Sequence, residues 1–197
     1  MTITGITDIV SDTTPQLGGD LDINGKEING TGDVNLTGIV TATKFVGAIE
    51  TSNATITGGT YSGNVDLSGL LKEGVNIVAN KLSAVTDTPI NLSDGMVHLF
   101  TTTEDATATP DIRFDGSTSL NSKMSTGEAI TVVIIIAAAA GGYYAQLTID
   151  DSAVTEEWMN GSAPSAGGAD GYDVYTHNII KTADATFVVL SNLVNFT

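Results

Sequence analysis

The side chains that could carry out catalysis are few, and their spacing argues against most reactions. The only histidines are His98 and His177, and the chain has no cysteine. A histidine base needs a serine and a carboxylate beside it, and no Gly-x-Ser-x-Gly motif marks such a serine. We expect His177 to lie on a strand, with Tyr175 and Ile179 on the same side. A packed histidine is therefore favoured over a base or a metal ligand.

One short segment has the oxygen spacing of a calcium loop. In Asp20-Leu21-Asp22-Ile23-Asn24-Gly25, donors stand at positions one, three and five and glycine at position six, as in an EF-hand. The twelfth position, however, is Thr31, and no helical pattern flanks the loop. A strand with solvated polar side chains is favoured, so we predict no metal site and no cofactor.

Two adjacent pairs of carboxylates, Asp150-Asp151 and Glu156-Glu157, stand in the C-terminal half. Neighbouring residues on a strand point to opposite faces, so neither pair is ready for acid–base work. We predict no catalytic residue and no enzymatic activity.

Exposed aromatic side chains offer a second kind of chemistry, stacking on sugar rings. Trp158 precedes a loop rich in glycine, alanine and serine, from Asn160 to Gly171. Its ring could stack on a sugar or pin that loop to the domain, and the pin is favoured because such a loop needs an anchor. The candidate glycan contacts are Trp158, Tyr143, Tyr144 and Tyr172.

Residues 1–70 repeat one short pattern, an acidic or amide residue followed by alternating apolar and small polar residues and then glycine. The copies begin at Asp20, Asp33, Asn53 and Asn64. The alternation predicts short strands that turn at the glycine. Each strand offers only two apolar side chains, too few to offset a backbone ordering cost of about 1–2 kcal/mol per residue. We therefore expect a repetitive β segment intertwined with identical chains, a trimer stalk that also attaches the protein to its partner. Its candidate interface residues are Ile3, Ile6, Ile9, Leu17, Leu21, Ile23, Val34, Leu36, Ile56, Val65 and Leu67.

The remaining chain is expected to be a connector followed by a compact all-β domain. Residues 71–95 are assigned to the connector. There, Leu71, Val75, Val78 and Leu82 could make one face of a short helix, or 77–82 could form a hairpin that turns at Ala79-Asn80. The hairpin is favoured because glycine and β-branched residues weaken a helix. Residues 96–197 predict a β-sandwich or jelly roll, with strands at 96–102, 110–115, 128–139, 143–150, 172–181 and 185–195.

The charge balance excludes two classes of partner. The chain has 7 Lys plus Arg against 23 Asp plus Glu, a net charge of −16. Nucleic acids and anionic membrane surfaces require clustered cations, so we predict neither partner. The apolar run from Ile130 to Ala140 is shorter than the roughly 20 residues of a membrane-spanning helix. Its β-branched side chains indicate a buried strand.

Three parts of the chain resemble bacteriophage proteins. The segment from Ser11 to Gly25, which reads SDTTPQLGGDLDING, resembles one common in tail-fibre and appendage proteins, especially of marine phages. TATKFVG at residues 41–47 looks like a second recurring piece. The C-terminal part, with QLTID at 146–150, Trp158, GSAP at 161–164 and the run 173–182, is similar to a terminal domain of phage virion proteins. His177 departs from the apolar or aromatic residue expected there.

The resemblance implies a non-enzymatic virion component, commonly trimeric, that is assembled in the bacterial host cytoplasm. Its N-terminal part would attach to other virion proteins of the capsid or tail, with the β-domain outward. A capsid decoration protein and a module that binds a bacterial surface glycan remain the alternatives. An enzyme that degrades surface polysaccharide is disfavoured, because such sites need a defined pair of carboxylates.

Overall fold

The computed structural model describes residues 37, 68–84 and 89–197 of the chain. The repeats, the calcium-like segment at 20–25 and all eleven candidate interface residues between Ile3 and Leu67 lie outside the described residues. The expectations for them stay predictions.

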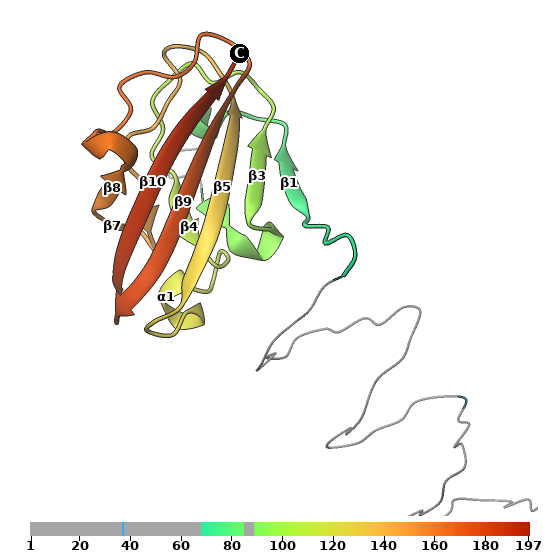
Figure 1. Ribbon diagram of the computed structural model, residues 1–197, viewed down its shortest axis with the longest axis vertical. Helices are drawn as coiled ribbons and strands as arrows, with labels where there is room; N and C mark the ends of the chain where they lie inside the picture. Colours follow the sequence, from blue (N-terminus) through green and yellow to red (C-terminus); the bar gives the residue numbers. More distant parts are fainter. Residues whose placement is uncertain (1–36, 38–67, 85–88) are drawn as a thin grey trace, which may run out of the picture. The chain divides into compact units, whose positions relative to one another are not determined.

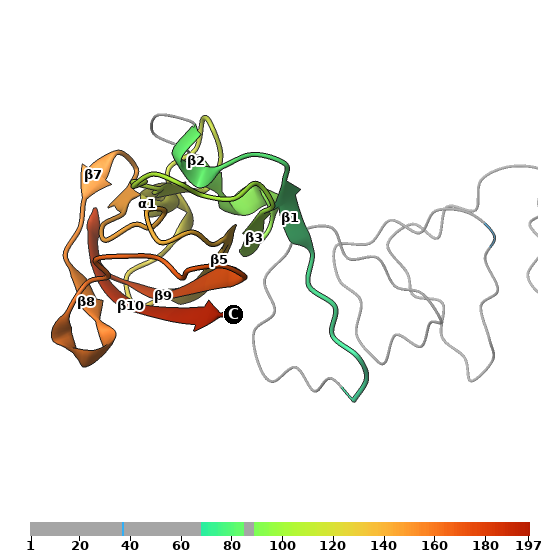
Figure 2. The ribbon, with the colours of Figure 1, turned by 90° about the horizontal axis from the view of Figure 1, so that it is seen from above.

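The described part is built from two β-sheets, which confirms the all-β, sandwich-like character expected from the sequence (Figure 1). The six-stranded sheet has the order β1 (Val75–Val78), β3 (Val97–Phe100), β5 (Ala129–Ala137), β9 (Tyr172–Ala183), β10 (Thr186–Phe196) and β8 (Glu156–Trp158). The four-stranded sheet has the order β2 (Pro89–Asn91), β4 (Asp111–Arg113), β6 (Thr148–Ile149) and β7 (Ser152–Ala153). Figure 2 shows β2, β7 and α1 (Leu120–Lys123) on one side of the layer formed by β5, β9 and β10.

The three long strands follow directly from alternating side chains. In β5 every second residue, Val132, Ile134 and Ile136, is fully buried, and the residues between them face outward. β9 pairs antiparallel with both β5 and β10. The β9–β10 connection turns at Ala185, which has a positive φ of 47°. The predicted strands at 96–102, 110–115, 128–139, 172–181 and 185–195 are confirmed as β3, β4, β5, β9 and β10.

The core lies between the two sheets and is mostly aliphatic. It is formed by buried residues of both sheets and of the segments that join them: Leu82, Ile90, Phe100, Ile112, Leu120, Val132, Ile134, Ile136, Tyr144, Leu147, Ile149, Tyr175, Ile179 and Val189. Burial of such side chains contributes about 1.5–3 kcal/mol each, which makes this core the main source of stability for the described domain.

The hairpin predicted at residues 77–82 is wrong. β1 instead pairs in parallel with β3, with Ile77 opposite Leu99. The Asn76 amide also lies 3.2 Å from Nδ1 of the buried His98. After Ala79-Asn80 the chain enters the short 3₁₀ helix η1 (Leu82–Ala84), whose Leu82 is buried. The interval expected to be a connector therefore supplies β1, β2 (Pro89–Asn91) and η2 (Leu92–Asp94) to this domain.

A buried carboxylate holds this early segment to the rest of the domain. Glu104 is fully buried, and its Oε2 accepts the Ser83 backbone N–H at 2.8 Å. Its Oε1 accepts the Ser83 hydroxyl and the Asp105 backbone N–H. Several donors on one carboxylate satisfy the charge that burial removes from water, so residues 82–84 are fixed to the loop after β3.

The strand predicted at 143–150 is shorter than expected, because only Thr148 and Ile149 pair as β6. Two residues that precede β6, Tyr144 and Leu147, are held by hydrogen bonds from their backbone N–H groups to side chains. The Tyr144 backbone N–H donates to the Tyr175 hydroxyl, and the Leu147 N–H donates to Glu156. These bonds replace a sheet ladder in that segment.

Candidate functional site

Four polar side chains from different segments meet inside the core and form one continuous line of hydrogen bonds. We call this line the polar chain; it consists of Tyr144, His177, Ser191 and Glu156. The Tyr144 hydroxyl lies 2.7 Å from His177 Nε2, and His177 Nδ1 lies 2.8 Å from Ser191 Oγ. The Ser191 hydroxyl then donates to Glu156 Oε2 at 2.9 Å.

The direction of each hydrogen bond in the polar chain follows from the carboxylate of Glu156 at one end of the line. An ionised carboxylate only accepts, so the Ser191 hydroxyl proton points to Glu156. Ser191 Oγ is then the acceptor for a proton on His177 Nδ1, which leaves Nε2 to accept from Tyr144. The neutral Nδ1–H tautomer of His177 thus satisfies every polar atom of the line, an assignment made from the bonding pattern.

Burial controls the ionisation of the same groups. It lowers the pKa of His177 from 6.5 to about 4 and raises the pKa of Tyr144 well above 10. Burial also raises the pKa of Glu156, although hydrogen bonds from Ser191 and the Leu147 backbone N–H oppose this. His177 is therefore neutral at pH 7 and Tyr144 keeps its proton.

Aromatic rings enclose the polar chain. Tyr144 stacks on Tyr175 with ring centroids 3.9 Å apart. Trp158 meets Tyr175 and His177 edge-on, at centroid distances of 6.4 and 6.1 Å. These contacts place the indole against the core, as expected for a pin, although one side of the ring also borders a surface groove.

The order of the polar chain differs from that of a nucleophilic triad. In a triad the histidine lies between serine and acid, so that it takes the serine proton while the acid orients it. Here Ser191 lies between His177 and Glu156 and is nearly buried, at 3 % exposed. Its hydroxyl proton already bonds a carboxylate, and the other nitrogen of His177 bonds a tyrosine. The arrangement ties four segments together but leaves no free base next to a free nucleophile.

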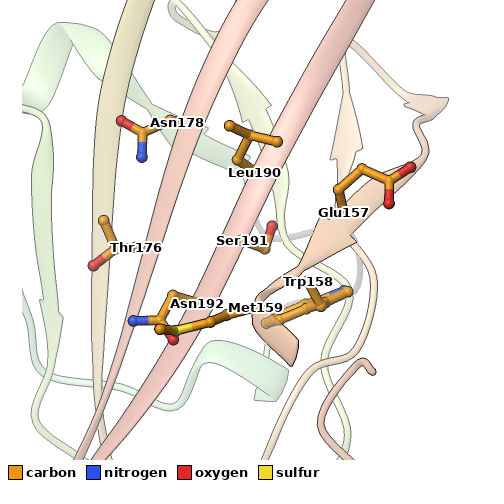
Figure 3. A pocket seen from close by; sticks show the side chains of 8 residues that line it. All are labelled: Glu157, Trp158, Met159, Thr176, Asn178, Leu190, Ser191 and Asn192. Carbon is orange, nitrogen blue, oxygen red and sulfur yellow. The ribbon is translucent and has the colours of Figure 1, made fainter. Parts of the chain in front are cut away.

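A surface groove lies where β8 meets the outer side of β9 and β10 (Figure 3). Its volume is about 510 Å³. Trp158 and Met159 form one wall, Leu190 and Asn192 another, and Thr176 and Asn178 lie beyond them. Indole, amide and hydroxyl groups are the chemistry that sugar recognition uses.

The four candidate glycan contacts do not form one surface. Trp158 borders the groove, whereas Tyr172 is exposed at the start of β9, where it pairs with Phe196. Tyr143 is half-buried. Tyr144 is fully buried with its hydroxyl on His177, so the prediction of a glycan contact there does not fit this structure.

The paired carboxylates have structural partners. Glu156 points into the core, whereas Glu157 faces outward, as neighbours on a strand should. Asp150 accepts the Leu120 and Asn121 backbone N–H groups at 2.7 and 2.9 Å, and Asp151 bonds Arg113 at 2.6 Å. Among the residues described, no group of three or more histidine or acidic side chains is placed to hold a metal ion.

Searches of family models, curated proteins and solved structures found no match to this chain. In the described part of the chain, no helix is long and apolar enough to cross a membrane.

The polar chain was not predicted from the sequence, except that His177 was expected on a strand beside Tyr175 and Ile179. All three are buried on the inner side of β9, so that expectation is confirmed. The partners of His177 come from residues 144, 156 and 191, and no local pattern links those positions.

Proposed function

We propose that this chain is a non-enzymatic structural protein of a bacteriophage particle. It forms a short trimeric fibre-like appendage, attached through its N-terminal part with the β-domain outward. The observation that carries the non-enzymatic part is the polar chain. Its one histidine and one serine are buried, mutually bonded and closed off by a tyrosine and a carboxylate, so the groups that could do chemistry strengthen the core instead.

The assignment to a phage particle rests on two resemblances. Residues 11–25 and 41–47 resemble phage tail-fibre and appendage proteins, and the pieces between residues 146 and 182 resemble a terminal domain of phage virion proteins. The net charge of −16 agrees with a protein that stays soluble and binds no nucleic acid. A trimer would also supply the apolar partners that the N-terminal repeats lack.

Mass spectrometry of purified particles, with copy numbers, tests this proposal. A few to tens of copies per particle are expected for a tail appendage. Hundreds of copies would instead indicate a capsid decoration protein. Absence of the chain from particles purified from cells that express it would overturn the proposal.

A glycan-binding module is the second candidate, and the groove beside Trp158 is the observation that favours it. An array of bacterial surface glycans probed with the full chain is the test. Binding that Asn178→Ala and Asn192→Ala abolish, and that Thr107→Ala on a distant exposed loop leaves intact, would support this function. Absence of binding across the array would set it aside.

A further inference from the structure

The outer side of the six-stranded sheet is unusually apolar for a surface. We define the outer face as the outward side chains of β1, β3, β5, β9 and β10. One row crosses all five strands in register: Ile77, Leu99, Ile135, Val174 and Val194. A second row contains Val75, Val97 and Val133, and a third contains Ala137, Tyr172 and Phe196.

Several of these side chains are strongly exposed. Ile77 is 66 % exposed, Phe196 56 % and Val194 42 %. Single exposed apolar residues are ordinary, but a contiguous apolar patch this wide marks an interaction surface. Figure 1 shows the three long strands side by side.

The outer face also carries no charge. The outward positions of its five strands are aliphatic, aromatic, threonine or asparagine, and the nearest outward acid of this sheet is Glu157 on β8. The chain as a whole, in contrast, has 30 Lys, Arg, Asp and Glu residues. A partner recognised through charge would need charged side chains of the opposite sign on the outer face, and the outer face has none.

We propose that the outer face is the surface on which copies of this chain associate. Identical chains of charge −16 repel one another over most of their surface, so they can meet closely only where charge is absent. An apolar sheet face can pack against a second copy of itself, because two such faces lie about 10 Å apart like the layers of a sandwich. The occupant is therefore a second copy of this chain.

The size of the face is sufficient for a stable contact. The five strands of the outer face, β1, β3, β5, β9 and β10, have 4, 4, 9, 12 and 11 residues. With about 3.3 Å per residue and about 4.8 Å between strands, the face projects roughly 600 Å². Side chains roughen that projection, so the accessible area approaches the ~800 Å² per partner of a standard interface.

This inference goes beyond the proposed function, because self-complementary faces join two copies about a two-fold axis, whereas the trimer contacts predicted from the sequence all lie between Ile3 and Leu67. The β-domain would carry its own contact between copies. The groove lies at the β8 edge, beside the row that begins at Ile77 and ends at Val194.

Sedimentation of the full chain with two lysine variants at opposite ends of that row tests the proposal. In Val194→Lys and Ile77→Lys a charge enters the apolar face, yet the net negative charge falls, so weaker association could not come from added repulsion. Thr107→Lys, on the exposed loop between β3 and β4, adds the same charge away from the sheet and is the control.

The wild type and Thr107→Lys are expected to sediment at twice the 20.2 kDa chain mass or more. Each face variant should need at least ~10-fold more protein to associate, because a desolvated ammonium costs more than one tenfold step. Circular dichroism melts that stay cooperative would show that the variants fold.

The possible outcomes separate this inference from the proposed function. An oligomer that both face variants leave intact would overturn the inference alone. A monomeric wild type would overturn it as well, and would point to another protein or to residues 1–67 as the cover of the face. Dissociation of both variants, with the chain absent from phage particles, would support the interface and overturn only the virion function.

Discussion

The hydroxyl of Tyr144 lies 2.7 Å from Nε2 of His177, and this contact closes one end of the polar chain. Both side chains are fully buried. His177 Nε2, in its unprotonated form, has this hydroxyl as its donor, so the tyrosine decides whether the core histidine is satisfied.

Replacing Tyr144 with phenylalanine removes that donor and keeps the ring stacked on Tyr175. A buried acceptor left unpaired costs about 1–3 kcal/mol, so the free energy of unfolding should fall by that amount. Urea unfolding at pH 7 measures it. Tyr172→Phe, at an exposed position, should change the same quantity by less than about 0.5 kcal/mol. Equal effects of the two variants would argue against a structural role for the contact.

Acid should weaken the fold through His177. Burial lowers its pKa from 6.5 to about 4. At a pH between these two values, His177 is therefore protonated in the unfolded chain and neutral in the folded chain. This contribution to stability is complete above pH 6.5 and is lost as the pH falls towards 4, by up to roughly 3 kcal/mol.

Glu156 opposes this trend, because burial raises its pKa in the fold. Its contribution is present at low pH and is lost as the pH rises through its folded pKa. His98 acts in the same direction as His177, since burial lowers its pKa as well. In urea unfolding at pH 7.5 and pH 4.5, His177→Gln should therefore lose less stability on acidification than the wild type. An unchanged pH dependence in His177→Gln would contradict the neutral assignment.

Trp158 should matter for stability more than for binding. Its half-buried indole contacts Tyr175 and His177 edge-on, and we expect Trp158→Ala to lower the free energy of unfolding by about 2 kcal/mol, below the 3–5 kcal/mol of a fully buried ring. Trp158→Phe should recover part of the loss. The melting temperatures of both variants are the measurement. An unchanged melting temperature in Trp158→Ala would contradict the role of this indole as a pin.

Gly171 is a position where a glycine is required. Its φ is +73°, and a Cβ there would overlap the backbone oxygen of Phe196 at the end of β10. Gly171→Ala should therefore destabilise the domain by about 2 kcal/mol or more. Gly116→Ala is the matched control, because nothing lies within 4 Å of its Cβ position. A melting temperature lowered equally in both variants would contradict this reason.

The long strands were predictable because their side chains alternate. For β5, the five consecutive β-branched residues 132–136 also predict a strand. The short strands β2, β7 and β8 have two or three residues each and offer no period to detect. β1 was mistaken for a hairpin arm because its parallel partner β3 lies about twenty residues further on, a separation that no local turn signal encodes.

The polar chain was hidden for a related reason. Its members are separated by loops, and only the packing of β8, β9 and β10 brings Glu156, His177 and Ser191 together. Tyr144 was predicted as a candidate glycan contact, whereas stacking on Tyr175 draws it inward. Sequence alternation also could not show that the outward rows of five strands align into one uncharged face.

Sedimentation of the full chain at rising salt concentration tests most directly whether copies assemble through uncharged contacts. Salt at 1 M shortens the reach of charge repulsion to about 3 Å, from about 10 Å at 0.1 M, and does not weaken apolar contacts. We expect an oligomer whose association tightens as sodium chloride rises from 0.1 to 1 M. A chain that stays monomeric throughout, or an oligomer that dissociates as salt is added, would contradict it.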